Sequence, residues 1–278
     1  MPTVGECIPL WPDRDNMPGR VVTGQEQHEK ARETPHIKLF LLESRQPRPL
    51  MIVLPGGGYS GRAAHEADPV AEWFNGCGLH ALVCHYRVAP WQHPAPLADA
   101  QRAVRLARQN AAAWQIDASR IGVLGFSAGG HLACSVANFG DDGDAASGDL
   151  IARQSSRIQA LVACYPVISM GGAFGHKGSQ KNLLGEQPDS DLLRRMSLEK
   201  SVTPHNPPTF LWHTAADAGV PVENSLQYAQ ALSAAKVPFA LHIYPHGRHG
   251  IGLARDFPGA ARDWTRACET WLHELGWA

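Results

Sequence analysis

The stretch VLGFSAGGHLA, residues 123–133, decides the fold: it predicts a strand, a sharp turn and the start of a helix. Residues 121–124 are apolar and partly β-branched, which favours a buried strand, and residues 128–139 favour a buried helix. Between them lies a Gly-x-Ser-x-Gly pattern centred on Ser127, the spacing of a nucleophile elbow. A Cβ on either flanking glycine would collide with the neighbouring strand and helix. The turn would lift the Ser127 hydroxyl clear of the sheet, and the N–H of Ala128 would point from the helix N-terminus toward whatever that hydroxyl attacks.

Glycine is common in this chain, with 27 residues, so the pattern alone also fits a plain Gly/Ser-rich turn. The partners of Ser127 elsewhere in the chain therefore decide between a turn and a catalytic site.

Composition and charge exclude several classes of function. The chain has 278 residues, of which 44% are hydrophobic and 18% are charged, and its formal net charge is −1. This balance implies no strong attraction to nucleic acid or anionic lipid, so we expect no nucleic-acid partner. No run of ~18 apolar residues occurs, so we expect no membrane span.

The six cysteines are scattered and form no C-x-x-C motif. Cys84, Cys134 and Cys164 lie in apolar segments and are predicted to be buried thiols. The first residues do not combine a basic segment with an apolar one, so no signal peptide is predicted unless one has been removed. A reducing, cytoplasmic setting is the simplest expectation.

Strands and helices are predicted to alternate along most of the chain. Apolar runs predict strands at 37–42, 50–54, 79–85, 157–165, 209–214 and 239–244, and the first of these is a candidate edge strand. Helical patterns cover 69–74, 96–115, 222–235 and 258–275. We therefore expect one α/β domain over residues 1–278, with a mostly parallel central sheet and helices on both faces. Residues 1–34 would wrap irregularly over the surface. Residues 169–206 would form an insertion or lid, with a short helical piece near 191–199.

A serine nucleophile needs a base, and the base needs an orienting carboxylate. The expected chain order is Ser, Asp or Glu, then His. Asp217 follows the predicted strand 209–214, and His249 follows the predicted strand 239–244. We assign Asp217 as the acid that fixes the tautomer of the ring, and His249 as the base that takes the Ser127 proton. His246 competes with His249 for that role.

Three histidines near the C-terminus, His242, His246 and His249, also suggest a metal cluster. However, His242 lies inside a predicted strand, His246 lies beyond its end, and no acidic or thiolate ligand accompanies them. We predict no metal site and no cofactor.

Three consecutive glycines, 56–58, follow the predicted strand 50–54, where an oxyanion-binding loop belongs. Glycines allow backbone N–H groups to approach a substrate oxygen closely. We assign Gly57, Gly58 and Ala128 to the oxyanion hole, and the N–H of Tyr59 remains an alternative donor. A phosphate-binding loop is not favoured, because no Gly-Lys-Ser/Thr follows.

Several of these segments resemble the α/β-hydrolases of the acetyl esterase/lipase group, and bacterial acetylxylan esterase-like or bifunctional feruloyl/acetyl-xylan esterase-like proteins most of all. The resemblance covers about residue 50 to the C-terminus, and it is carried by residues 55–59, 85–90, 94–99, 117–121, 125–133, 182–185, 207–211, 213–225 and 244–250. It assigns the nucleophile to Ser127, the acid to Asp217 and the base to His249. Two positions depart from related sequences: Pro55 stands where lipase-like relatives carry His, and Ala216 stands where a second Asp is frequent.

These observations predict a serine carboxylester hydrolase that acts through an acyl-enzyme on a small-molecule or oligosaccharide ester. The resemblance implies that the substrate is a carbohydrate that carries acetyl groups. The side chains of Tyr59 and Trp91 are candidates for stacking on a sugar ring, and hydrophobic filler is the alternative. Likewise, Ser179, Gln180 and Asn182 either face the pocket or lie in a solvated loop.

Two other functions remain open at this point. One is a peptidase or amidase on the same scaffold, and the other is a non-catalytic protein that binds a ligand. The oligomeric state and the acyl length stay undetermined.

Overall fold

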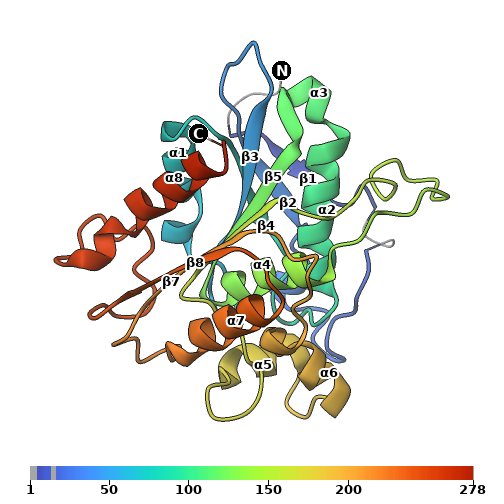
Figure 1. The fold of residues 1–278 in the computed structure, drawn as a ribbon. Coiled ribbons are helices and arrows are strands. Elements are labelled where there is room, and N and C mark those ends of the chain that lie inside the picture. Colours follow the sequence, from blue (N-terminus) through green and yellow to red (C-terminus); the bar gives the residue numbers. More distant parts are fainter. Residues whose placement is uncertain (1–4, 14–16, 278) are drawn as a thin grey trace.

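A mostly parallel β-sheet runs through the molecule (Figure 1). The computed structural model describes residues 5–13 and 17–277. Within these ranges the sheet has eight strands in the order β1-β2-β4-β3-β5-β6-β7-β8. β1 and β2 are antiparallel to their neighbours, and β3 to β8 are parallel to one another. The strands are β1 (Cys7–Pro9), β2 (His36–Phe40), β3 (Arg48–Leu54), β4 (His80–His85), β5 (Ile116–Phe126), β6 (Ala160–Cys164), β7 (Thr209–Thr214) and β8 (Phe239–Tyr244).

Helices cover both faces of this sheet, which confirms the predicted α/β architecture. α1 and α8 pack on one face, and α2, α4 and α7 pack on the other (Figure 1). The helices are α1 (Asp68–Gly76), α2 (Ala95–Gln109), α3 (Ala111–Trp114), α4 (Ser127–Phe139), α5 (Lys177–Leu184), α6 (Ser190–Arg195), α7 (Glu223–Ala234) and α8 (Trp264–Glu274). Short 3₁₀ turns are η2 (Glu29–Ala31), η3 (Ala64–Glu66), η4 (Leu198–Lys200) and η5 (Ala260–Asp263).

The central strands are buried on both sides. In β3, Leu50, Ile52 and Leu54 join the core beneath α2 and α4, whereas Met51 and Val53 join the core beneath α1 and α8. Successive side chains of a strand point to opposite faces. A strand with both faces covered therefore needs an unbroken apolar run rather than an alternating pattern.

The N-terminal segment contains more structure than the sequence predicted. The predicted wrap 1–34, of which residues 1–4 and 14–16 lie outside the described residues, includes strand β1 and the turn η2. β1 pairs with β2, so β2 is not the edge strand that we expected.

The predicted helix 96–115 is also corrected. It is two helices, α2 and α3, separated at Asn110, and Gln115 after them adopts a left-handed conformation with φ 55°.

A buried ion pair holds the loop that follows β4. The guanidinium of Arg87 meets the Asp99 carboxylate through two hydrogen bonds, of 2.8 and 2.7 Å, and both side chains are fully buried. The Trp11 indole N–H donates to the same carboxylate at 2.7 Å, and the Trp91 ring lies 4.6 Å from the guanidinium carbon. These contacts attach the N-terminal segment and the β4 loop to α2.

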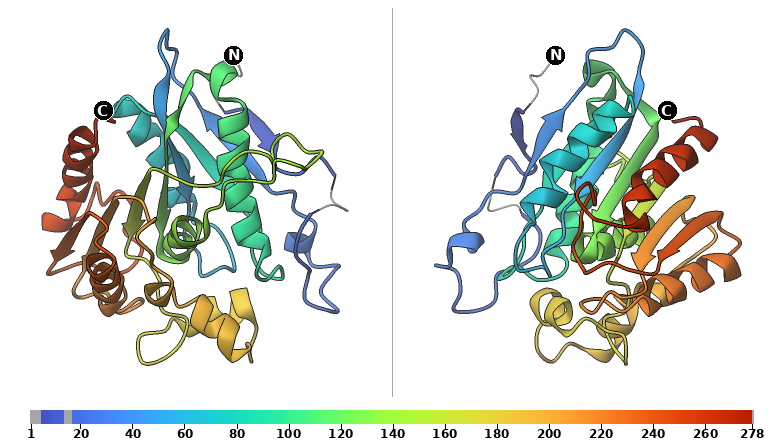
Figure 2. Two further views of the ribbon diagram at one scale, coloured as in Figure 1. Left: turned by 45° about the vertical axis from the view of Figure 1, so that its right-hand side comes forward. Right: turned by 90° about the vertical axis from the view of Figure 1, so that its left-hand side faces the viewer.

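Residues 169–206 leave the regular alternation and form α5, α6 and η4. Both views in Figure 2 show this insertion, coloured yellow to gold, at the lower end of the molecule below α4. The predicted helical piece near 191–199 corresponds to α6 and η4, whereas α5 was not predicted.

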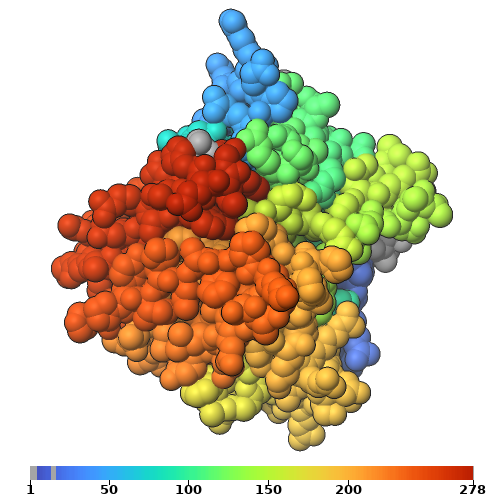
Figure 3. All heavy atoms as spheres, viewed as in Figure 1, coloured from blue at the N-terminus to red at the C-terminus, as the bar shows by residue number. Residues whose placement is uncertain are grey.

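Two loops stand out from the body in the space-filling view: residues 141–156 on the right and the connection between β2 and β3 at the top (Figure 3). Among the described residues, no helix combines the length and the apolar character needed to cross a membrane.

Candidate active site

Ser127 lies at the junction of β5 and α4, in a strained left-handed conformation with φ 53°. The two flanking glycines are required by close backbone packing. A Cβ on Gly125 would lie 2.1 Å from the carbonyl oxygen of Gly129, and a Cβ on Gly129 would lie 2.2 Å from the carbonyl oxygen of Leu54. The steric reason predicted for the Gly-x-Ser-x-Gly pattern is therefore confirmed.

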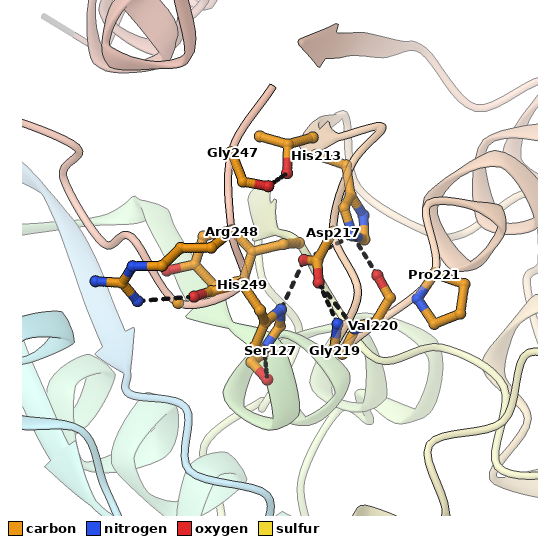
Figure 4. Close-up of polar contacts among 12 residues, drawn as sticks. Ser127, His213, Asp217, Gly219, Val220, Pro221, Gly247, Arg248 and His249 are labelled. Carbon is orange, nitrogen blue, oxygen red and sulfur yellow. Dashed lines mark hydrogen bonds and ion pairs between the residues drawn. The ribbon is translucent and has the colours of Figure 1, made fainter. Parts of the chain in front are cut away.

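Two loops at the carboxyl ends of β7 and β8 bring Asp217 and His249 to this serine (Figure 4). His249 Nε2 is 2.7 Å from Ser127 Oγ, and His249 Nδ1 is 2.7 Å from Asp217 Oδ2. The three residues selected from the sequence thus form one continuous chain of hydrogen bonds. His246, the competing histidine, is exposed. The geometry therefore favours His249 as the base.

The Asp217 carboxylate is held in its charged form by its surroundings. Oδ1 accepts hydrogen bonds from the N–H groups of Gly219 at 2.8 Å and Val220 at 2.9 Å. Burial by itself would raise the pKa of Asp217, but the nearby His213 ring and the hydrogen bonds from His249 and Val220 outweigh it and hold that pKa well below its usual range. An ionised carboxylate can stabilise a protonated His249 ring.

His213, at the end of β7, is a supporting residue that the sequence analysis missed. Its Nε2 lies 3.0 Å from the Val220 carbonyl oxygen and 3.4 Å from Asp217 Oδ2, and its Nδ1 lies 2.8 Å from Ser225 Oγ. A proton on Nε2 satisfies the carbonyl, so Nδ1 accepts from the serine hydroxyl. The ring is fully buried and fixes the turn that carries Asp217. The sequence held one signal for this role: His213 lies in residues 213–225, one of the segments that carry the resemblance to α/β-hydrolases.

The loop after β3 presents free backbone donors beside Ser127. Gly57, Gly58 and Tyr59 have φ values of 134°, 62° and 59°. The N–H groups of these residues and of Ala128 have no acceptor among the described residues. A Cβ on Gly56 would lie 3.0 Å from Ser127 Cβ, which places this loop against the serine. The arrangement leaves backbone N–H groups available to an oxygen of a bound ligand.

The insertion is attached to this same loop. The Asn182 side chain, on α5, donates to the carbonyl oxygen of Gly58 at 2.8 Å. Ser179 instead lies 2.8 Å from His176 Nδ1, at the start of α5, and Gln180 donates its backbone N–H to the His176 carbonyl oxygen. Of the three polar residues considered in the insertion, Asn182 therefore contacts the loop beside Ser127.

The side chains of Tyr59 and Trp91 are buried, at 1% and 8% exposure, which corrects their candidate role of stacking on a sugar ring and favours the alternative, hydrophobic filler. The Tyr59 hydroxyl lies 2.8 Å from His131 Nδ1. The Trp91 ring covers the Arg87 guanidinium. Each aromatic ring packs against a partner inside the protein, as a filler of the core would.

The described residues contain no group of three or more His, Cys, Asp or Glu side chains arranged to hold a metal ion. His242 stacks on Phe210, with ring centroids 4.9 Å apart, and His249 is engaged with Ser127 and Asp217.

The BD-FAE family model matches residues 39–232, which is more than half of the chain. The chain belongs to the BD-FAE family. This BD-FAE chain is 38% identical over 227 residues to endo-1,4-beta-xylanase B of Butyrivibrio fibrisolvens, a match that covers 80% of this chain and 35% of the relative. It is 33% identical over 223 residues to the acetylxylan esterase of Xylanibacter ruminicola, covering 78% of this chain and 44% of the relative. The chain thus spans less than half the length of these two curated relatives.

A solved structure resembles this BD-FAE chain over nearly its whole length. It is the acetyl ester-xyloside bifunctional hydrolase from Caldicellulosiruptor lactoaceticus, with a TM-score of 0.92 and 48% sequence identity, and the match covers 98% of this chain and 97% of that one. The carboxylesterase Cest-2923 from Lactobacillus plantarum follows with a TM-score of 0.74 and 27% identity, covering 93% and 97%. These likenesses confirm the predicted resemblance to α/β-hydrolase esterases.

Proposed function

We propose that this protein is a serine carboxylester hydrolase that removes acetyl groups from an acetylated xylan or xylo-oligosaccharide. The hydrogen-bonded series from Ser127 through His249 to Asp217 carries the proposal, with both links at 2.7 Å. A hydroxyl bonded to an imidazole, which is itself oriented by a carboxylate, is the arrangement that activates a serine nucleophile. The relatives named as acetylxylan esterase and acetyl ester-xyloside hydrolase support the choice of substrate.

In the first half of the reaction, Ser127 Oγ attacks the ester carbonyl carbon while its proton passes to His249 Nε2. The carbonyl oxygen becomes an oxyanion, and the N–H groups of Gly57, Gly58 and Ala128 donate to it. The carbon–oxygen bond to the sugar then breaks, and the sugar oxygen takes the proton from His249. The sugar alcohol leaves, and the acetyl group stays on Ser127.

In the second half, a water molecule gives a proton to His249 Nε2 and attacks the acetyl carbonyl carbon. The same backbone donors hold the second oxyanion. The bond to Ser127 Oγ breaks, and Oγ recovers the proton from His249. Acetic acid leaves, and the enzyme returns to its starting state with atoms and charge in balance.

The single α/β domain, the lid formed by residues 169–206 and a cytoplasmic location remain part of this proposal. The contact of Asn182 with Gly58 supports the lid, and six free cysteine thiols support a reducing compartment.

The substitution Ser127→Ala tests the proposal. We expect it to abolish hydrolysis of p-nitrophenyl acetate and the release of acetate from acetylated xylan, with an unchanged far-UV circular dichroism spectrum. Ser147→Ala, in an exposed loop, is the matched control and should keep full activity. A series of p-nitrophenyl esters from acetate to octanoate should show the highest kcat/KM at acetate. Turnover retained by Ser127→Ala would refute the assignment.

A further inference from the structure

Glu66 is a buried carboxylate that the proposed reaction does not use. It ends the 3₁₀ turn η3 and is 2% exposed. A buried carboxylate is costly unless its oxygens are hydrogen-bonded. Both oxygens of Glu66 are engaged, and each points to a different loop of the candidate site.

One oxygen holds the loop after β3. Glu66 Oε2 accepts from the backbone N–H of Gly56 at 2.8 Å. Gly56 precedes Gly57 and Gly58 and is pressed between Glu66 and Ser127, since a Cβ there would lie 2.6 Å from Glu66 Oε2 and 3.0 Å from Ser127 Cβ. The carboxylate thus fixes the peptide that leads into the oxyanion-binding residues.

The other oxygen holds the loop after β8 through Tyr165. The Tyr165 hydroxyl donates to Glu66 Oε1 at 2.6 Å and accepts from the Gly252 N–H at 2.8 Å. The Tyr165 ring also packs edge-to-face on the His249 ring, with centroids 5.1 Å apart. Tyr165 directly follows β6 and has φ 35°, so a strained backbone carries this ring. The tyrosine therefore links the carboxylate to the segment that carries the base.

Neighbouring groups keep the Glu66 carboxylate between these two loops. Burial raises the pKa of Glu66 above its usual value, and the hydrogen bonds from Tyr165 and Gly56 offset only part of that rise. His65 Nε2 lies 3.7 Å from Oε1 and 3.0 Å from the Gly250 carbonyl oxygen, which adds a second contact between η3 and the His249 loop.

We propose that Glu66, acting through Gly56 on one side and Tyr165 on the other, is a positioning residue that sets the oxyanion-binding loop against the catalytic base. This inference rests on the proposed function. Positioning errors weaken interactions that are strongest in the transition state, so the loss falls on kcat and leaves KM nearly unchanged.

Glu66→Gln tests this role with little change of shape. A glutamine offers one carbonyl oxygen and one NH₂ group where two donors, the Gly56 N–H and the Tyr165 O–H, both need an acceptor. We expect kcat for p-nitrophenyl acetate to fall about 10- to 100-fold. This loss is smaller than the loss of kcat caused by deleting a hydrogen-bond donor of an oxyanion hole. KM should stay within about threefold. Each kcat is normalised to the active-site concentration, titrated by the burst of p-nitrophenol.

Two further variants complete the experiment. Tyr165→Phe keeps the ring but removes the hydroxyl, and it should lower kcat in the same way, which keeps the test valid if Glu66→Gln does not fold. Glu43→Gln makes the same chemical change at an exposed carboxyl group in the loop between β2 and β3, and should leave kcat within twofold of the wild type.

The outcome separates this inference from the proposed function. A kcat within fivefold of the wild type in both Glu66→Gln and Tyr165→Phe would overturn the role of Glu66. A loss seen equally in Glu43→Gln would also overturn it. Absence of esterase activity in the wild-type protein, or full activity in Ser127→Ala, would instead overturn the proposed function.

Discussion

Replacing Asp217 with asparagine changes which nitrogen of His249 carries the proton. In the wild type, Asp217 Oδ1 accepts from Gly219 and Val220, and Oδ2 accepts from His249 Nδ1. An asparagine has one acceptor oxygen, and the two backbone donors retain it. Its NH₂ group then faces His249 Nδ1, which must accept, so the proton moves to Nε2. A protonated Nε2 donates to Ser127 Oγ and cannot take the serine proton.

The expected loss is large because the base is then held in the wrong tautomer. In the serine-protease triad the equivalent change lowers kcat about 10⁴-fold, which corresponds to about 5 kcal/mol of transition-state stabilisation. We expect a similar loss in Asp217→Asn, measured as kcat with p-nitrophenyl acetate at pH 7. Asp144→Asn, in an exposed turn, is the matched control and should retain wild-type activity. A kcat within tenfold of the wild type, with an unchanged circular dichroism spectrum, would refute the reasoning.

Two stability predictions follow from buried groups that take no part in the proposed reaction. Asp99→Ala leaves the Arg87 guanidinium buried without its partner, so the free energy of unfolding in urea should fall by about 3–5 kcal/mol. The control Asp142→Ala removes a carboxylate from an exposed ion pair and should lower the free energy of unfolding far less. Equal losses in the two variants would contradict the account. Burial lowers the pKa of His131 from 6.5 to about 4, so its neutral ring contributes stability that is complete above about pH 6.5 and is lost as the pH falls toward 4. Between pH 7 and pH 4.5, the free energy of unfolding should therefore fall by about 2–3 kcal/mol less in His131→Gln than in the wild type. The same fall in both proteins would contradict this role of His131.

The elements predicted best are those whose signal is local. β7 and β8 begin and end at the predicted residues, because each is a short apolar run with turn-forming residues at both ends. Ser127, Asp217 and His249 can be predicted as one site for a topological reason. Each residue follows a strand of a parallel sheet, and the carboxyl ends of such strands meet at one edge of the sheet.

The elements that were missed depend on contacts that the sequence does not display. β1 has three residues and exists because it pairs with β2. α5 is polar and begins at a histidine cap, which is not one of the usual capping residues. Tyr59 and Trp91 are candidates for stacking on a sugar ring from the sequence, but their partners, His131 and Arg87, are identified only by the folded structure.

Long sequence separation also hid the supporting groups of the site. Glu66 and Tyr165 are 99 positions apart, and Asn182 and Gly58 are 124 positions apart. A glutamate or an asparagine in a polar segment is ordinarily solvated, so composition and periodicity carry no sign of these contacts.

The central claim is that Ser127 Oγ attacks the substrate while His249 accepts its proton. Treating the protein with a fluorophosphonate probe and mapping the adduct by peptide mass spectrometry tests it most directly. The account predicts one probe per chain, attached to Ser127, with labelling abolished in His249→Ala. An adduct on another residue, or undiminished labelling of Ser127 in His249→Ala, would contradict it.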